Sequence, residues 1–217
     1  MKKITTILLS FLFISFQSVK SEVGVGITGA FHMLDASGTE TTRTSGETNN
    51  GSQTNEVVIP ELFIESIADN GVAAGISYIP TRELGSKSRT DSNSGGDSGT
   101  YKAEAELDNV IQFYLDIPTP LSIGGFDVYA KAGIQHATIV TLESLNSGST
   151  YPNEDVFGFT IGFGTKGDLN FGNLYYKAEA VYTDFGEYKA NDEAGTGNKV
   201  EADLDAISAK FSIGYKF

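Results

Sequence analysis

The sequence predicts an all-β fold, an eight-stranded antiparallel up-and-down barrel, and three observations lead to this prediction. Eight segments alternate apolar with polar residues, the links between them are alternately long and short, and the final segment carries an apolar stripe that ends on an aromatic residue. An alternation with a period of two places successive side chains on opposite faces of an extended strand. Each segment therefore has one apolar wall and one polar wall.

The final stretch, residues 204–217, shows this alternation most clearly. One face carries Ile207, Ala209, Phe211, Ile213, Tyr215 and Phe217, and the other carries Ala206, Ser208, Lys210, Ser212, Gly214 and Lys216. The ending resembles the terminal strand of bacterial outer-membrane β-barrel proteins, whose last residue is typically Phe preceded by alternating hydrophobic positions. The resemblance implies a barrel inserted by the outer-membrane assembly machinery, with Phe211, Ile213, Tyr215 and Phe217 as the assembly signal.

The first 21 residues have the pattern of a secretory signal peptide. Lys2 and Lys3 precede an apolar run at 4–16, and residues 19–21 offer small side chains near a cleavage point before Glu22. The apolar run is too short for a membrane helix. We therefore expect a signal peptide at 1–21 and a barrel domain at 22–217.

The eight predicted strands are joined by links that alternate in length. The strands are expected at about 23–34, 57–67, 72–79, 101–117, 128–142, 156–165, 174–185 and 200–217. The long polar links are 35–55, 85–100, 146–155 and 186–199, and the tighter ones are 68–71, 118–125 and 166–173. Asn70-Gly71 is a strong hairpin signal. All long links thus lie at one end of the barrel, and the tight turns and both termini at the other.

This asymmetry is typical of outer-membrane barrels, which have short periplasmic turns and long extracellular loops. Most of the segments also approach the roughly 9 to 11 residues that a tilted transmembrane strand needs. Pro60 and Pro80 are nearly symmetric about the turn at Asn70, so we expect both at the height where their strands leave the membrane.

The alternation does not say which wall faces inward, and a soluble lipocalin-like barrel would reverse the assignment. Aromatic residues near both ends of the apolar walls and mixed charges on the polar walls favour lipid outside and charge inside. The predicted lumen network comprises Glu61, Glu65, Lys102, Glu104, Glu106, Lys131, Lys177, Glu179 and Lys210. An eight-stranded barrel is just wide enough to be filled by side chains, so this set is interpreted as an ionic plug, with a transient ion path as the alternative.

Composition excludes several classes of function. The chain has 217 residues, no Cys, and a net charge of −13, which the loss of Lys2, Lys3 and Lys20 with the signal would change to −16. So acidic a protein is a poor partner for nucleic acid. Without Cys no disulfide can brace it, and with His32 and His136 as the only histidines a zinc site lacks strong ligands.

Motifs that could carry chemistry have simpler explanations. The glycine pattern Gly24-x-Gly26-x-x-Gly29 lies inside a strand rather than between a strand and a helix, which excludes a dinucleotide fingerprint. The carboxylates Glu154, Asp155, Glu187, Asp192 and Glu193 lack the spacing of a known calcium loop. His136 and Thr138 resemble part of the His and Ser pattern of outer-membrane lipid A deacylases, but Thr replaces Ser and no outward Glu follows. We expect no catalytic residues, no cofactor and no metal.

In plan the chain is similar to the OmpA transmembrane domain, the OmpX group and opacity-type surface proteins. This resemblance implies a monomeric, non-catalytic outer-membrane barrel with a structural or surface-interaction role, in envelope integrity or adhesion, through acidic extracellular loops. A narrow channel and a lipid-modifying enzyme are the alternatives. The expected partners are outer-membrane lipid and lipopolysaccharide, the assembly machinery, and an extracellular ligand of unknown identity.

Overall fold

The computed structural model describes residues 21–217 except 42, 44–45, 47, 92–98 and 145–149, so the predicted signal peptide lies outside the described part apart from Ser21. Nine strands form one antiparallel sheet that closes on itself through a pairing of β3 with β5. They are β1 (Ser21–Thr41), β2 (Thr48–Ala68), β3 (Ala73–Ile79), β4 (Arg82–Asp91), β5 (Gly99–Ile123), β6 (Phe126–Ser144), β7 (Glu154–Asp168), β8 (Leu174–Asn191) and β9 (Lys199–Lys216). In this described part, no helix is long and apolar enough to cross a membrane.

The predicted antiparallel barrel is confirmed, with one strand divided in two. Both β3 and β4 pair with β5, so together they occupy a single position in the ring, which keeps eight positions around the barrel. The division falls at Pro80-Thr81, because proline has no backbone N–H to donate to a neighbouring strand. The ring is completed where β9 pairs with β1 from Gly24 opposite Lys216 to Thr41 opposite Lys199.

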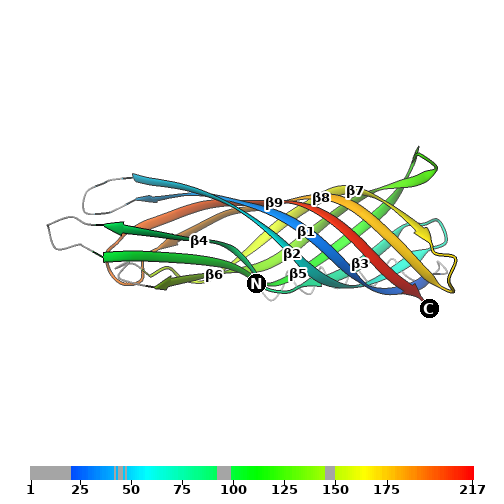
Figure 1. Ribbon diagram of the computed structural model, residues 1–217, viewed down its shortest axis with the longest axis horizontal. Coiled ribbons are helices and arrows are strands. Elements are labelled where there is room, and N and C mark those ends of the chain that lie inside the picture. Colours follow the sequence, from blue (N-terminus) through cyan, green and yellow to red (C-terminus); the bar gives the residue numbers. More distant parts are fainter. Residues whose placement is uncertain (1–20, 42, 44–45, 47, 92–98, 145–149) are drawn as a thin grey trace, which may run out of the picture.

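The strands cross the molecule obliquely, as they must in a closed barrel. Figure 1 shows the hairpin ends of β1–β2 and β4–β5 at the left and the C-terminus at the right. At the right-hand end the predicted turn at Asn70-Gly71 is present: Gly71 has a φ of 82°, and its N–H donates to the carbonyl of Ala68 at 2.8 Å. All tight turns lie at this end, which is the periplasmic end of an outer-membrane barrel.

The long polar links were predicted as loops, and this was wrong for most of their length. β1 and β2 pair without interruption up to Thr41 opposite Thr48, and β4 occupies residues 85–91 of the predicted link 85–100. Ser, Thr and Asn can occupy a strand when its other face has a core to pack against. The alternation of buried and exposed residues continues here through Leu34, Leu84 and Leu204, which supply that core.

A β-bulge in β5 overturns part of the predicted face assignment. Asn109 adopts a φ of 52°, and the register jumps from Asp108 opposite Thr138 to Ile111 opposite His136. The extra residue reverses which parity faces inward, because side chains alternate along a strand. Asn tolerates this left-handed conformation better than most residues, which favours the bulge at this position.

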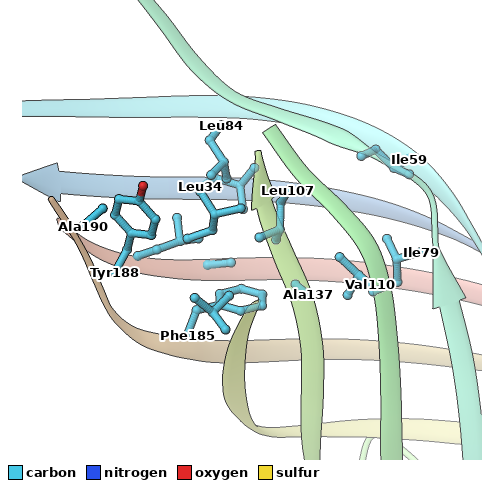
Figure 2. Packing of buried hydrophobic residues seen from close by; sticks show 14 residues of the cluster. Leu34, Ile59, Ile79, Leu84, Leu107, Val110, Ala137, Phe185, Tyr188 and Ala190 are labelled. Atoms are coloured by element: carbon cyan, nitrogen blue, oxygen red, sulfur yellow. The ribbon is translucent and has the colours of Figure 1, made fainter. Parts of the chain in front are cut away.

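The interior of the barrel is divided into two parts along its length. The periplasmic part is lined by charged and hydroxyl side chains, and the extracellular part by apolar ones. Figure 2 shows this second part, the upper apolar core. It comprises Leu34, Ile59, Ile79, Leu84, Leu107, Val110, Ala137, Ile139, Val156, Phe185, Tyr188, Ala190, Leu204 and Ala206.

Candidate functional site

A belt of exposed apolar side chains surrounds the periplasmic part of the barrel. Its members are Val23, Val25, Ile27, Phe31, Val58, Leu62, Ile64, Ile76, Tyr78, Ile111, Leu115, Ile117, Phe157, Phe159, Ile161, Phe163, Tyr182, Ile207, Phe211, Ile213 and Tyr215. From Val23 to Phe31 the belt covers about nine residues of β1, close to the length that a tilted strand needs to cross a bilayer. So large a continuous apolar surface is costly in water and favourable in lipid.

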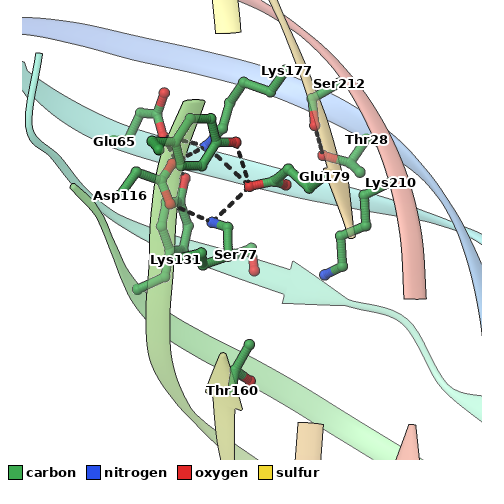
Figure 3. A network of polar contacts seen from close by, with 12 residues as sticks. Thr28, Glu65, Ser77, Asp116, Lys131, Thr160, Lys177, Glu179, Lys210 and Ser212 are labelled. Carbon is green, nitrogen blue, oxygen red and sulfur yellow. Dashed lines mark hydrogen bonds and ion pairs between the residues drawn. The ribbon is translucent and has the colours of Figure 1, made fainter. Parts of the chain in front are cut away.

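Inside the belt, buried ion pairs fill the lumen (Figure 3). The Lys177 ammonium lies 2.6 Å from Asp116 and 2.9 Å from Glu65, and Lys131 lies 2.8 Å from Asp116 and 3.0 Å from Glu179. These contacts join β2, β5, β6 and β8 across the barrel. Charges removed from water need such partners, because an unpaired buried ion costs several kcal/mol or more.

Three tyrosines complete this network from the same layer. The hydroxyls of Tyr114 and Tyr175 donate to the two oxygens of Glu65 at 2.7 and 2.9 Å, and the hydroxyl of Tyr129 donates to Glu179 at 2.6 Å. Glu65 and Glu179 thus each receive a neutral donor as well as a cation. The mixture satisfies the carboxylate oxygens without adding net charge to the lumen.

A second ionic group lies nearer the extracellular side. Lys210 contacts both oxygens of Glu61, at 2.8 and 3.0 Å, and His32 Nε2 lies 3.3 Å from the same carboxylate. His32 Nδ1 is in turn 2.8 Å from the Ser208 hydroxyl. Between the two groups remains a cavity of about 10 Å³, which matches a single water molecule. We name the set Glu61, Glu65, Asp116, Lys131, Lys177, Glu179 and Lys210 the ionic plug.

The structure brings six of the nine predicted lumen residues together and places two others, Glu104 and Glu106, elsewhere. Glu61, Glu65, Lys131, Lys177, Glu179 and Lys210 lie in the lumen. Glu104 and Glu106 do not, because the bulge at Asn109 turns them to the outer wall, where they lie opposite Leu142 and Val140. The side chain of Lys102 lies outside the described residues.

The predicted lumen network did not include Asp116, although its carboxylate binds two lysines. It also left out Arg82, which lies between the predicted strand 72–79 and the predicted link 85–100 and was assigned to neither. Arg82 is the first residue of β4 and only 3% exposed. Its Nε and Nη1 have no hydrogen-bond partner, and its guanidinium lies 5.9 Å from the centre of the Phe185 ring.

The predicted assembly signal lies on the outer wall of β9. Phe211, Ile213 and Tyr215 are exposed members of the belt, and Phe217 is 76% exposed at the periplasmic end. The N–H of Phe217 donates to the Val23 carbonyl at 2.9 Å, which ties the last residue to the first strand. These positions are accessible from lipid along the strand that closes the ring.

Beyond the belt, the strands continue as an extracellular extension whose outer wall is acidic. Asp205 lies directly opposite Asp35 on β1 and Asp184 on β8. Desolvation, together with these two carboxylates, raises the pKa of Asp205 above its ordinary value. The same wall carries Glu56, Glu83, Glu104, Glu106, Asp108, Asp155, Glu187, Glu201 and Asp203. Among the described side chains, the exposed lysines and arginines of the extension are Arg43, Lys189 and Lys199.

The carboxylates considered for calcium lie apart. Glu154 and Asp155 begin β7, Glu187 is on β8, and Asp192 and Glu193 are in the following turn. Desolvation opposes the charge of Asp192, but hydrogen bonds from Thr150, Ala194 and Thr196 outweigh it and lower its pKa. Over the described ranges, no three metal-binding side chains form a cluster that could hold an ion.

An apolar belt around a plugged, ring-closed antiparallel sheet defines the class: the chain is a bacterial outer-membrane β-barrel, and it lies in the outer membrane with its belt in contact with lipid. The barrel is small, and its strands continue beyond the belt on the extracellular side. The soluble barrel, which would turn the apolar wall inward along the whole strand, does not fit this arrangement.

Among solved structures, the chain is similar to the outer membrane protein AlkL in DMPC lipid bilayers, with a TM-score of 0.52 and 8% identity over 94% of this chain and 93% of that one. The translocator domain of the autotransporter NalP from Neisseria meningitidis gives a TM-score of 0.34 at 10% identity, over 100% and 96%. Ail from Yersinia pestis gives 0.29 at 12% identity, over 88% and 99%. No family model and no curated protein matches the sequence. At this identity the likeness to AlkL shows the fold alone.

Proposed function

We propose that the protein is a closed, non-catalytic outer-membrane barrel that acts at the cell surface through the acidic outer wall of its extracellular extension. The observation that carries this proposal is the contrast between the two surfaces of the barrel. The inner surface is filled over both parts, by the ionic plug and by the upper apolar core. Charged side chains that a partner could reach therefore lie on the outer wall of the extension.

The acidic wall favours a cationic partner. Asp35, Asp184 and Asp205 lie side by side on three neighbouring strands, where like charges repel one another. A basic protein segment or another cationic surface would relieve this repulsion and would be attracted from a distance. A role in adhesion or envelope integrity follows if that partner belongs to another cell or to the surrounding envelope.

The narrow channel is the weaker candidate. Ions would have to cross the layer in which the ammonium groups of Lys177 and Lys131 both lie within 3 Å of the Asp116 carboxylate. They would then have to cross the upper apolar core, where an ion has no polar partner. In planar bilayers we therefore expect no conductance steps, and reproducible steps would favour the channel instead.

The enzymatic alternative has little support from the outer wall. The Thr138 hydroxyl donates to Asp155 at 2.9 Å, and His136 lies 3.7 Å from the same carboxylate and packs against Phe157. A nucleophile needs a hydrogen bond to its base, and here the carboxylate separates the two. We propose that these residues form an interfacial contact, so His136→Ala should leave the acyl chains of lipid A unchanged on mass spectra.

Binding of a fluorescent polylysine to the barrel in nanodiscs of zwitterionic lipid tests the surface role. Replacing Asp35, Asp184 and Asp205 by Asn should weaken binding, and added salt should weaken it further. The matched control replaces Glu22 by Gln and Asp69 and Asp127 by Asn, which removes the same charge from the periplasmic end. Equal weakening by both sets, or no binding at all, would contradict the proposal.

The remaining expected partners are part of this proposal. The assembly machinery would recognise Phe211, Ile213, Tyr215 and Phe217, and lipopolysaccharide would surround the extracellular rim of the belt. We expect a monomer, because every strand position in the ring already has a neighbour on each side over the membrane-spanning length. No nucleic acid partner is expected of so acidic a protein.

A further inference from the structure

The barrel has a seam between β2 and β4 where the ladder of backbone hydrogen bonds is missing. The pairing of β2 with β3 ends at Leu62 opposite Tyr78, and β4 pairs only with β5. Extending the register by two residues would place Pro60 opposite Pro80, and neither can donate a backbone hydrogen bond. Two prolines facing one another therefore end the ladder at the upper rim of the belt.

Side chains bridge the seam above this point. The Asn55 amide donates to the Glu83 carbonyl at 2.7 Å, and the Gln53 side chain lies over Gly85. Between this bridge and the prolines, no hydrogen bond joins β2 to β4 among the described residues. Between residues 57–60 of β2 and residues 79–82, which run from the end of β3 to the start of β4, side-chain packing alone closes the wall, and we name this stretch at the height of the lipid surface the window.

Arg82 lies at this window and points into the barrel. It is 3% exposed, it sits at the boundary between the ionic plug and the upper apolar core, and it makes no hydrogen bond through Nε or Nη1. The carboxylate that acts on it electrostatically is Glu61. Lys210 and His32 already contact that carboxylate, at 2.8 and 3.3 Å. A buried guanidinium with two unpaired N–H groups beside an apolar core is a costly arrangement that calls for an acceptor.

The surroundings of Arg82 specify the acceptor. A guanidinium presents parallel N–H groups that match the two oxygens of a carboxylate. On the inner side of the window lie the apolar side chains Ile59 and Leu84, and on its outer side Val58 and Tyr78 are exposed to lipid. A ligand that fits both the guanidinium and these apolar surroundings has one carboxylate and an apolar tail.

We infer that Arg82 binds the carboxylate of a membrane amphiphile, whose head enters from the lipid through the window between β2 and β4 while its tail remains in the lipid against Val58 and Tyr78. Arg82 lies inside the barrel, whereas the acidic wall, which includes Glu56 and Glu83 beside the window, lies outside it. Binding requires no passage through the ionic plug, because the head stops at the boundary between the two parts of the lumen.

The experiment uses the full barrel in nanodiscs of zwitterionic lipid and a photoreactive twelve-carbon carboxylate with a diazirine in mid-chain. Mass spectrometry should find the label on residues 57–60 and 79–84. Excess dodecanoate should compete, whereas dodecanol, dodecyltrimethylammonium and acetate should not. Labelling spread over the whole belt, or equal competition by dodecanol, would overturn the inference. Competition by acetate would also overturn it, because the site would then bind a small anion only.

Arg82 is tested by substitution. Arg82→Gln should weaken dodecanoate competition by at least about tenfold, since a hydrogen bond to a charged group contributes about 1.5–3 kcal/mol. Arg82→Lys keeps the charge but loses the parallel N–H groups of the guanidinium, so it should weaken dodecanoate competition to an intermediate extent. The control Arg43→Gln removes an exposed cation from the extension and should have no effect. If Arg82→Gln does not fold, as judged by a gel of unheated and boiled samples, Arg82→Lys and the competition series still decide the outcome.

Discussion

The ammonium of Lys177 on β8 lies 2.6 Å from the carboxylate of Asp116 on β5, across the lumen and within the belt. Lys177 is the shared member of the plug, because it also contacts Glu65 and approaches Glu179. The buried anions Glu61, Glu65, Asp116 and Glu179 are balanced by the buried cations Lys131, Lys177, Lys210 and Arg82. A neutral interior allows the barrel to exclude bulk water without leaving an excess charge in the membrane.

Lys177→Met should destabilise the barrel strongly. It leaves Asp116 and Glu65 without their shared cation, and breaking a buried pair in this way costs about 3–5 kcal/mol. The free energy of unfolding can be measured by urea titration in lipid vesicles. Lys189→Met is the matched control, because Lys189 pairs with Glu187 at 3.0 Å on the exposed wall and should be nearly neutral. Equal losses in the two variants would show that the plug does not stabilise the fold.

A second prediction concerns the fit of glycine against tyrosine in the lumen. A Cβ at Gly75 would clash with the Tyr114 ring, which is held by its hydrogen bond to Glu65. Gly75→Ala should therefore displace Tyr114 and cost about 1–3 kcal/mol, as overpacking does. Gly29→Ala is the control, since its Cβ would meet nothing closer than 4.0 Å. The two variants are compared by the temperature at which half of the protein runs as the unfolded band on a gel. An unchanged midpoint temperature for Gly75→Ala would contradict the prediction.

Much of the fold was predictable from the sequence because alternation and turn chemistry are local properties. The apolar wall of β9 and the turn at Asn70-Gly71 both appear as predicted. The bulge at Asn109 was not predictable, since an extra residue interrupts the period without changing composition. It alone moved Glu104 and Glu106 from the predicted lumen to the outer wall.

The extracellular extension was missed for a different reason. Its outward residues are Ser, Thr, Asn and acids, and sequence reasoning gave their polarity more weight than the sparse inward Leu34, Leu84 and Leu204. These leucines are far apart in the chain and form a core only when the sheet closes. Arg82 was missed with them, because its burial depends on β4 lying beside β5.

The pH dependence of stability should report on the row of aspartates. Desolvation and the neighbouring Asp35 and Asp184 raise the pKa of Asp205 in the folded state. Between the ordinary aspartate pKa of 3.8 and this raised pKa, the folded state binds more protons than the unfolded state. Stability therefore falls as the pH rises through that window, and at neutral pH Asp205 lowers the free energy of unfolding.

Asp205→Asn should thus raise the thermal midpoint at pH 7, and the difference from the natural protein should shrink as the pH falls towards 3.8. Asp127→Asn, an exposed substitution in the periplasmic hairpin, is the control for a general effect of removing an acid. Thermal midpoints measured at several pH values give both differences. A difference for Asp205→Asn that does not change with pH would contradict the assignment.

The last prediction concerns the origin of the seam. If Pro60 and Pro80 end the ladder between β2 and the third strand position, replacing both by Val restores two N–H groups and adds residues that favour strands. The pairing that stops at Leu62 opposite Tyr78 should then extend upward. Amides in residues 57–61 and 79–84 should exchange more slowly with deuterium, because they become paired.

The matched control replaces Pro118 and Pro120, which lie in the periplasmic hairpin formed by β5 and β6 away from the seam. It should leave exchange at 57–61 unchanged. If the Pro60 and Pro80 variant also leaves it unchanged, the packing of Leu84 into the upper apolar core must hold β4 away from β2 instead. Leu84→Ala would then be the change that closes the seam. Slower exchange in the proline variant together with weaker labelling by the photoreactive carboxylate would tie the window to the absence of the ladder, because a paired edge leaves the head group no path to Arg82.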